Sequence, residues 1–330
     1  MADTMRAWRV TTLGEPAAAL QLENVEVPQP GPGEVLIRTR AVSANFPDVL
    51  LCRGLYQVRP ELPFSPGIEL VGDVVALGDG VEGFEPGERV IGSKIGVLAE
   101  LAVLPASDVW PAPPELTDAE ASGLTVAYQT AWFALHRRAE LKAGEWLLVH
   151  AAAGGVGLAA VQLGGAAGAR VIGVVGSHEK AAVARAAGAE VVIVRGETDI
   201  AAAVKTATGG HGADAVFDPV GGDAFAASTK CIAFEGRIVV VGFAGGDIQT
   251  LPAGHVLVKN YSVLGLHWGM YPGIRPDLVD EARADLARLA QEGAIAPVVD
   301  HVVPFDAAPD ALTALAGGST VGRVVIEVAA

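Results

Sequence analysis

The sequence predicts an α/β protein in which a doubly wound parallel sheet is joined to a second, mostly β domain. Two observations predict this class. From about residue 145 onward, six short apolar runs alternate with helical patterns. Before residue 120, short strand-like runs are separated by turns rich in proline and glycine.

Length and charge limit the class of protein. At 330 residues, of which 51% are hydrophobic, the chain has room for two domains with sizeable cores. We expect one domain over residues 1–121 and 270–330 and the other over residues 122–269.

The net charge of −15 argues against nucleic acid as a partner. We see neither an apolar run long enough for a membrane span nor a secretory signal, so we expect a cytoplasmic protein with no membrane partner.

The cysteine content bears on metals and disulfides. Cys52 and Cys231 are the only two cysteines, and they lie far apart in the sequence. This excludes a disulfide framework and a cysteine-rich zinc site. We expect each thiol to be a small buried apolar group.

The first domain is expected to form short strands. Residues 34–44, 68–77, 87–92 and 100–110 are apolar runs separated by glycine- and proline-containing turns. This pattern is typical of a partly open, all-β barrel. A helical pattern follows over residues 115–139, with Thr117 as its possible N-cap.

The second domain carries the alternating pattern. Its apolar runs are continuous and rich in β-branched residues, which predicts strands covered on both faces of a parallel sheet. They span residues 146–151, 170–175, 190–194, 214–220, 237–243 and 262–268. A further helix is expected around residues 277–293, after which residues 298–328 return to complete the first domain.

A glycine-containing turn lies where the first of these strands meets its helix. The segment "HAAAGGVGLAAVQL" contains Ala152-x-Gly154-x-x-Gly157, a dinucleotide fingerprint with alanine in the first glycine position. In a Rossmann-type domain, such a turn presents backbone amides at a helix N-terminus to the pyrophosphate. The candidate residues are Ala153, Gly154, Gly155, Val156 and Gly157. The alternative is that the segment is filler in an alanine-rich chain.

The end of the second strand bears on the choice of dinucleotide. NAD-preferring sites usually have an acidic residue there that binds the ribose 2′-hydroxyl. This chain instead has Gly176 and Ser177, with Lys180 nearby. Small residues beside a lysine can hold a 2′-phosphate, so we expect NADPH as the cofactor. In the alternative interpretation, Lys180 and Arg185 belong to a solvated helix face.

Several segments together resemble a known family over essentially the whole chain. They are "HAAAGGVGLAAVQL", "ARVIGVVGSHEK", "SANFPDVLLCRGLY" and "PGIELVGDVVALGDGVEGFEPGERV". The sequence resembles the zinc-free quinone oxidoreductases of the medium-chain dehydrogenase/reductase superfamily, which implies a GroES-like catalytic domain. Zinc-using relatives carry a catalytic Cys near "GICGTD" and a His in "GHE". The matching places here are Ser43-Ala44-Asn45 and Gly67-Ile68-Glu69, so no zinc ligand set is expected.

The resemblance also implies roles for residues outside the glycine turn. Asn45 would face the nicotinamide ribose, or else be a turn residue before Pro47. Tyr56 would line the substrate pocket and donate to the acceptor oxygen, or else be a core or rim tyrosine. Thr125 would lie beside the nicotinamide, or else be an ordinary helical threonine.

The remaining implied cofactor contacts follow later strands. Arg195 stands next to Val194, where the family often has a tyrosine near the 2′-phosphate, and would have to substitute for it. Leu50 replaces the family's other pocket tyrosine. Further cofactor contacts are expected from Gly242, Phe243, Leu266, His267 and Trp268. His267 could also act as an acid, but a lone histidine at a strand end is more often structural.

The predicted function is that of an NADPH-dependent oxidoreductase, without zinc, that transfers hydride to a small electrophilic acceptor. The acceptor would be a quinone or an α,β-unsaturated carbonyl, and Asn45 and Tyr56 would be the catalytic residues. One alternative is an enoyl-thioester (acyl-CoA) reductase, for which Arg53, Arg59 and Arg137-Arg138 are candidates for a basic cleft entry. Another is a non-catalytic NADPH-binding protein. The resemblance also implies a homodimer.

Overall fold

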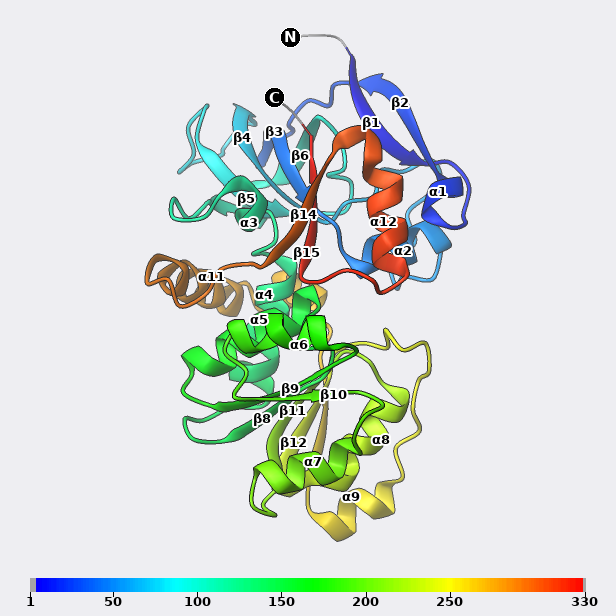
Figure 1. The fold of residues 1–330 in the computed structure, drawn as a ribbon. Helices are drawn as coiled ribbons and strands as arrows, with labels where there is room; N and C mark the ends of the chain where they lie inside the picture. The colour runs from blue at the N-terminus through cyan, green and yellow to red at the C-terminus, as the bar shows by residue number, and fades with distance from the viewer. Residues whose placement is uncertain (1–3, 329–330) are drawn as a thin grey trace. The chain divides into compact units, whose positions relative to one another are not determined.

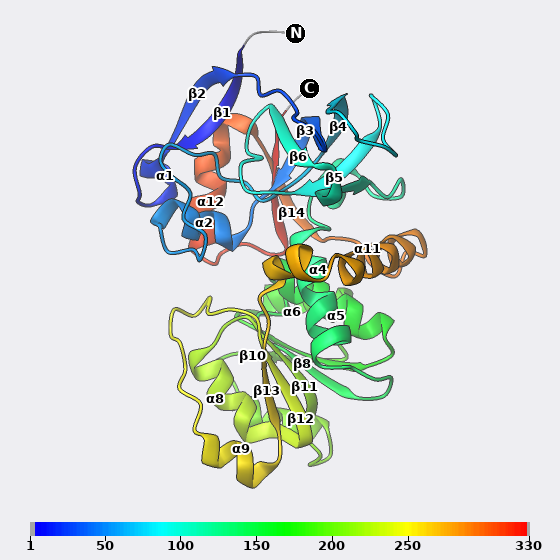
Figure 2. The same ribbon diagram turned by 180° about the vertical axis from the view of Figure 1, so that it is seen from behind.

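A computed structural model describes residues 4–328 of the chain. The chain forms two compact units, which Figures 1 and 2 show from opposite sides. The first unit contains the residues up to Val126 together with those from Ala296 onward, and the second is Ala127–Ile295. The first is mostly β-structure and the second is built around a parallel sheet, which confirms the predicted fold class.

The second unit ends later than the expected boundary at residue 269. Two helices beyond that point, α10 (Tyr271–Ile274) and α11 (Pro276–Gln291), pack within it. The Tyr271 ring lies 4.1 Å from the Phe133 ring, measured between centroids. Trp132 Nε1 donates to Asp285 at 2.9 Å. These aromatic contacts, which sequence periodicity does not reveal, hold both helices on the second unit.

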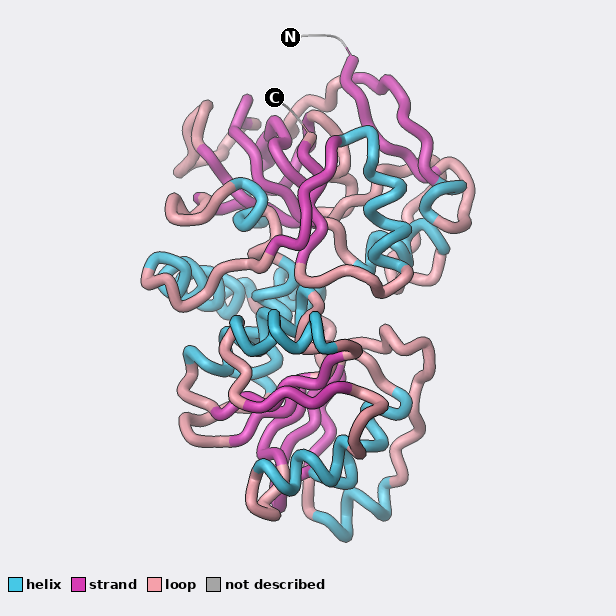
Figure 3. The backbone as a smooth tube through the Cα atoms, in the orientation of Figure 1, coloured by secondary structure: helices cyan, strands magenta, loops and turns pink. Residues whose placement is uncertain are grey.

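The sheet of the second unit contains six parallel strands. Its order is β10-β9-β8-β11-β12-β13. All six predicted runs are therefore strands, visible in magenta in Figure 3. The bounds are β8 (Trp146–Val149), β9 (Arg170–Val175), β10 (Val191–Val194), β11 (Ala213–Asp218), β12 (Ile232–Val240) and β13 (Ser262–Gly265).

Helices cover both faces of this sheet. Leu148 and Ile172 belong to a core cluster that also contains residues of α7 and α8, whereas Gly164 of α5 packs on Leu147, the neighbour that points to the opposite face. Burial on both faces explains why the apolar runs do not alternate. The helices are α5 (Gly155–Ala166), α6 (His178–Ala186), α7 (Ile200–Ala207), α8 (Gly222–Cys231) and α9 (Ala253–Lys259).

The first unit contains a two-stranded sheet, β1 with β2, and a larger antiparallel-rich sheet. The larger sheet has the order β14-β15-β3-β4-β5-β7, and β6 also pairs with β3. Its last two strands in the sequence, β14 and β15, come from the C-terminal segment, as predicted. The bounds are β1 (Thr4–Val10), β2 (Leu20–Glu26), β3 (Glu34–Ser43), β4 (Glu69–Leu77), β5 (Arg89–Ser93), β6 (Leu101–Pro105), β7 (Val109–Pro111), β14 (Val299–Pro304) and β15 (Arg323–Glu327).

The helical pattern expected over residues 115–139 is interrupted. Thr117 caps α3 (Asp118–Ala121) through a capping box with Glu120, as its position predicts. The chain then turns through Gly123 before α4 (Val126–Trp132), which continues as a π-helical turn over Phe133–Arg138. The turn at Gly123 makes room for a side chain of β15, described below. After Val126, α4 belongs to the second unit. Besides α3, the first unit contains the helices α1 (Pro16–Ala19), α2 (Phe46–Arg53) and α12 (Ala308–Ala316).

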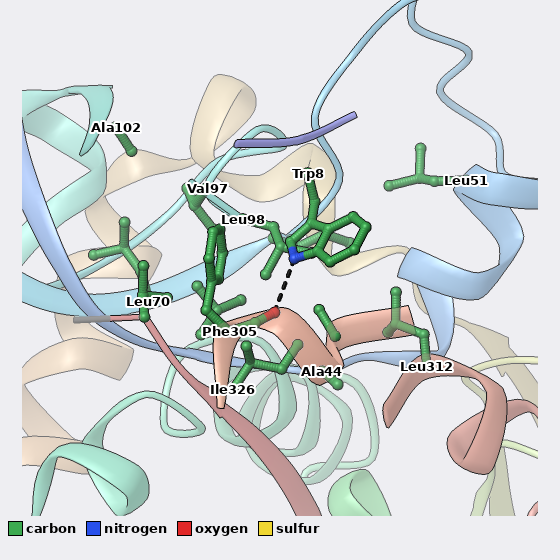
Figure 4. Packing of buried hydrophobic residues seen from close by; sticks show 14 of the residues in the cluster. Trp8, Ala44, Leu51, Leu70, Val97, Leu98, Ala102, Phe305, Leu312 and Ile326 are labelled. Carbon is green, nitrogen blue, oxygen red and sulfur yellow. Dashed lines mark hydrogen bonds between the residues drawn. The ribbon is translucent and has the colours of Figure 1, made fainter. Parts of the chain in front are cut away.

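The core of the first unit joins both ends of the chain. In Figure 4, Trp8 Nε1 donates to the carbonyl oxygen of Phe305 at 2.8 Å, and the two rings meet edge to face. Ala44 and Leu70 belong to the same buried cluster. They adjoin Asn45 and Glu69, so this core fixes the backbone on which the polar residues below are carried. Across residues 4–328, no helix is both long and apolar enough to cross a bilayer.

Candidate functional site

The predicted dinucleotide turn lies at the carboxyl end of β8, beside the point where the strand order reverses. Gly154 is the N-cap of α5, and the first helical bond runs from the Leu158 N–H to the Gly154 carbonyl at 2.8 Å. The amides of residues 155–157 therefore belong to the free first turn. That turn contains no acidic side chain. Its geometry suits an anionic ligand.

Gly157 has a strict steric requirement. A Cβ at this position would lie 2.1 Å from the Ala151 carbonyl oxygen, whereas a Cβ on Gly154 would lie 3.4 Å from the same atom. Ala151 itself has a φ of 50°. The close approach of helix to strand thus depends on Gly157, and the residues present fit the dinucleotide fingerprint.

Residues predicted to read the 2′-phosphate lie together at the ends of β9 and β10. Ser177 caps α6 and accepts from the Lys180 N–H at 3.3 Å. The guanidinium of Arg195 lies 3.9 Å from where a Cβ on Gly176 would be, and the Arg195 N–H donates to the Val175 carbonyl at 2.8 Å. Arg195 is exposed and forms no ion pair with a carboxylate in the part of the chain that the structure describes. A cationic group therefore stands beside the small residues, as the substitution for the family's tyrosine requires.

The other predicted cofactor residues follow β12 and β13 at the same edge of the sheet. Gly242 lies over Pro219 at the end of β11, and the exposed Phe243 begins the loop that continues from it. The Leu266 N–H donates to the Val240 carbonyl at 3.0 Å. His267 is exposed, and Trp268 Nε1 is buried with no hydrogen-bond partner among residues 4–328. The parallel order of the strands brings all of these residues to one edge.

Two polar residues that the sequence analysis did not single out lie below this edge. His150 directly follows β8, and Asp218 is the last residue of the neighbouring β11. His150 Nε2 is 2.8 Å from Ser228 Oγ, and Ser228 Oγ donates to the Ala224 carbonyl. Burial lowers the pKa of His150 and Arg195 acts in the same direction, whereas Asp218 opposes the shift. A polar residue at the end of a buried apolar run was the available signal.

Asp218 supports the turn that follows β11. Its Oδ1 accepts from the N–H groups of Val220 and Gly221, each at 2.9 Å. Its Oδ2 is buried and has no hydrogen-bond partner among the described residues. One carboxylate oxygen of Asp218 therefore fixes the turn at the sheet edge, and the other is left without a partner among those residues.

In the first unit, Asn45 is the N-cap of α2 and is 5% exposed. The Asp48 carboxylate binds two backbone N–H groups. Its Oδ2 accepts from the Asn45 N–H at 2.8 Å, and its Oδ1 accepts from the Gly67 N–H at 3.0 Å. Burial raises the pKa of Asp48 to about 7, and nearby Glu69 adds to the shift. The two segments where zinc-using relatives carry Cys and His are thus joined by hydrogen bonds.

The side-chain amide of Asn45 uses its full hydrogen-bonding capacity within the protein. Its Nδ2 donates to the Ser43 carbonyl at 3.0 Å and to Glu69 Oε1 at 2.9 Å. Its Oδ1 accepts from Nη1 and Nη2 of Arg323, both at 3.1 Å. Two donors and two lone pairs are all that an asparagine side chain offers. A contact to a nicotinamide ribose would therefore require one of these bonds to be given up.

Tyr56 and Thr125 differ in their surroundings. Tyr56 is partly buried against the apolar cluster, and burial together with Asp48 raises its pKa. No described residue accepts or donates a hydrogen bond at its hydroxyl. Thr125 is 1% exposed, and its Oγ1 is buried with no partner in residues 4–328. Within the same residues, no three His, Cys, Asp or Glu side chains gather to hold a metal ion.

Comparison with known proteins gives the family. Residues 31–114 match the alcohol dehydrogenase GroES-like domain, and residues 155–290 match the zinc-binding dehydrogenase family. Over 324 residues the chain is 36% identical to quinone oxidoreductase-like protein 2 of Bos taurus, covering 98% of this chain and 93% of that protein. The chain belongs to the medium-chain dehydrogenase/reductase superfamily.

Two further relatives of this medium-chain dehydrogenase/reductase differ in how much of their own length is matched. The structure of mycobacterial Rv1454c complexed with NADPH is 32% identical, with a TM-score of 0.91 over 98% of this chain and all of that one. A mycocerosic acid synthase-like polyketide synthase of Mycobacterium tuberculosis is 32% identical over 91% of this chain, which covers 14% of the synthase. Family membership and the NADPH-bound neighbour support an NAD(P)-dependent oxidoreductase. The predicted family is confirmed.

Proposed function

We propose that this protein is an NADPH-dependent oxidoreductase that transfers hydride to a quinone or an α,β-unsaturated carbonyl without a zinc ion. The observation that carries the proposal is the edge of the parallel sheet. There the predicted cofactor residues follow strands that end at the same edge of the sheet, where α5 begins with no acidic side chain in its first turn. The NADPH in the neighbouring Rv1454c structure supports the choice of cofactor.

The second unit would hold the cofactor. Backbone amides of residues 155–157 bind the pyrophosphate, and the loops after β12 and β13 bind the nicotinamide end through Gly242, Phe243, Leu266, His267 and Trp268. The 2′-phosphate is bound by Ser177, Lys180 and Arg195, beside Gly176. A charge-assisted hydrogen bond contributes about 1.5–3 kcal/mol.

Substitution of Arg195 tests the preference for NADPH. In Arg195→Ala, the Kd for NADPH should rise by roughly 10- to 100-fold, whereas the Kd for NADH should stay within about twofold. Arg185→Ala removes a cation of the neighbouring helix α6 and serves as the control, with both Kd values unchanged. Equal losses for both cofactors in Arg195→Ala would contradict a phosphate-reading role.

When bound, the nicotinamide supplies the hydride that the acceptor receives. The acceptor oxygen then develops negative charge, which a hydrogen-bond donor stabilises. The hydroxyl of Tyr56 is the proposed donor, because a tyrosine hydroxyl is protonated at neutral pH and no described side chain uses this one. Solvent or a nearby hydroxyl completes the proton transfer.

The donor set of the first unit supports chemistry without zinc. At the places where zinc-using relatives carry Cys and His, this chain has Asn45 and Ile68, and the Asn45 amide is engaged by Glu69 and Arg323. Neither an amide already bonded in this way nor an isoleucine is a zinc ligand. An already electrophilic acceptor does not require a Lewis acid.

Turnover with defined acceptors tests the reaction. NADPH oxidation should proceed with 1,4-benzoquinone, 9,10-phenanthrenequinone or a simple enone, and should survive a chelator. Tyr56→Phe should lower kcat by about 10- to 100-fold, the range expected for removal of one donor to a developing oxyanion. Loss of activity on chelation would contradict the zinc-free mechanism.

A second candidate is an enoyl-thioester reductase, which the similarity to the polyketide synthase favours. Crotonyl-CoA in the same assay separates the two activities, since a thioester reductase would prefer it to every quinone. Tight NADPH binding without turnover of any acceptor would favour the non-catalytic alternative.

The expected homodimer is part of this proposal. Among the described strands, β13 pairs only with β12 and so leaves one edge open, and Leu257 and Val258 of the adjacent α9 are 77% and 78% exposed. Sedimentation velocity should give a dimer for the wild type and a monomer for Leu257→Glu/Val258→Glu.

A further inference from the structure

Three strand ends meet at one buried point of the first unit. β15 begins at Arg323, β3 ends at Ser43 and β4 begins at Glu69, and the antiparallel pairing of these strands brings the three ends together. Arg323 Nε donates to Ser43 Oγ at 2.8 Å, and Arg323 Nη2 donates to Glu69 Oε1. Arg323 is 6% exposed and Glu69 is fully buried. The pair holds a cation and an anion out of water.

Glu69 connects two candidate site segments through its two oxygens. Its Oε1 accepts from the Asn45 amide, while its Oε2 accepts from the N–H of Val126 at 2.7 Å. Val126 is the first residue of α4, where a carboxylate is favoured by the helix dipole. Thr125 immediately precedes it. The position of Glu69 therefore sets the positions of both Asn45 and Thr125.

Arg323 closes the cluster from the other side. Its Nη1 and Nη2 both donate to the side-chain Oδ1 of Asn45, which fixes the orientation of the amide. A Cβ on Gly123 would lie 3.0 Å from Arg323 Nε, so the glycine leaves the space that the guanidinium occupies. The segment from Gly123 to Val126 is thus shaped around the ion pair.

We propose that Glu69 and Arg323 are positioning residues, which hold the Asn45 amide and the Thr125–Val126 segment in the arrangement that hydride transfer requires. Asn45 then acts as a member of this framework, with its amide directed to Glu69 and Arg323. The inference rests on the proposed function for its effect on turnover, but the local ordering that it requires is measurable without turnover.

A purely stabilising ion pair predicts a different result. Buried ion pairs contribute little net stability, and replacing both partners with apolar residues of similar volume is often neutral. A variant with two methionines, Glu69→Met/Arg323→Met, should therefore fold. If the pair only stabilised the fold, such a variant would also keep its activity. If the pair positions Asn45 and Thr125, the variant folds but loses turnover.

The experiment compares Glu69→Gln, Arg323→Lys and Glu69→Met/Arg323→Met in the full chain. We expect kcat for 9,10-phenanthrenequinone to fall at least tenfold in each folded variant, while the Kd for NADPH, which the second unit binds, changes less than threefold. Arg40→Lys is the matched control. Arg40 pairs with Asp73 and Asp118 in the same unit but is partly exposed. The kcat of Arg40→Lys should therefore stay within twofold of the wild-type value.

Hydrogen–deuterium exchange supplies the readout that does not depend on turnover. Amides of residues 122–128 and 43–48 should exchange at least fivefold faster in the three variants than in the wild type or in Arg40→Lys. An inactive wild type would overturn the proposed function, and exchange alone would then decide the inference. Unchanged exchange, unchanged kcat in a folded variant, or failure of all three variants to fold would each overturn the positioning role.

Discussion

The two units prepare their candidate sites in opposite ways. In the second unit, the sheet edge offers backbone amides at the start of α5 and an exposed Arg195 that forms no ion pair with a carboxylate among residues 4–328, an arrangement that suits an anion. In the first unit, the side chains of Asn45, Glu69 and Arg323 form hydrogen bonds with one another. One site is built from backbone geometry and open charge, and the other from side chains that need exact partners. We therefore expect the site in the second unit to tolerate side-chain changes better than backbone changes, and the site in the first unit to tolerate backbone changes better than side-chain changes.

The largest effect is expected from breaking the first unit's ion pair on one side. Arg323→Met leaves Glu69 buried without its cation, which should lower the free energy of unfolding by about 3–5 kcal/mol. Urea unfolding measures this loss. Arg275→Met, which disrupts a solvent-exposed pair with Asp277, is the control and should change it by less than about 1 kcal/mol. Equal effects would remove the distinction between the buried cluster and ordinary surface pairs.

Asp48 should make the stability of the first unit depend on pH. Its pKa of about 7 in the folded protein lies above its usual value of 3.8, so the protonated form is favoured by folding. Stability from this group is complete below the unfolded pKa and is lost as pH rises toward 7. Between pH 5 and 8, the wild type should lose about 2–3 kcal/mol more than Asp48→Asn.

Urea unfolding of both proteins at the two pH values measures that difference. Asp48→Asn loses one backbone hydrogen bond, so it should be less stable than the wild type at pH 5, and the gap should narrow at pH 8. Parallel pH profiles for the two proteins would mean that Asp48 is not the titrating group.

The second unit's dependence on backbone geometry is tested at Gly157. In Gly157→Ala the new methyl group would meet the Ala151 carbonyl, so the turn must shift, at a cost of about 1–3 kcal/mol. The Kd for NADPH should rise at least tenfold. Gly165→Ala, in the same helix and with no atom within 4 Å of the new Cβ, should leave the Kd unchanged and stabilise the protein by up to about 1 kcal/mol. Isothermal titration with NADPH compares the two variants.

The smallest effect is expected at an exposed helix cap, which serves as the reference for the changes in the buried cluster. Thr117→Ala removes the capping box of α3 and should lower the free energy of unfolding by about 0.5–2 kcal/mol, without changing kcat or the Kd for NADPH. Thermal unfolding and the NADPH assay measure both. A change in kcat comparable to that of Arg323→Lys would contradict a special role for the buried cluster.

The sequence predicts features that depend on neighbouring residues better than features that depend on contacts between residues far apart in the chain. The glycine turn, the six parallel strands and the Thr117 cap follow from neighbouring residues, and the structure has the strands and the cap where they are expected. The pairing of Glu69 with Arg323 joins residues 254 positions apart, and no local pattern indicates it. The second unit extends past residue 269 because Tyr271 and Asp285 contact Phe133 and Trp132, which is again non-local. The cytoplasmic location, NADPH preference and absence of zinc stay predictions.

The same separation has a consequence for how the chain is made. During synthesis, Glu69 leaves the ribosome long before Arg323, and all of Ala127–Ile295 is produced in between. At about 5–20 residues per second, the delay is on the order of 10–50 s. Phe305, Leu312 and Ile326 of the first unit's core are also still missing during that time. The first unit is therefore completed only after the second has been synthesised. Until then its N-terminal segment carries an unpaired acid and an uncovered apolar surface.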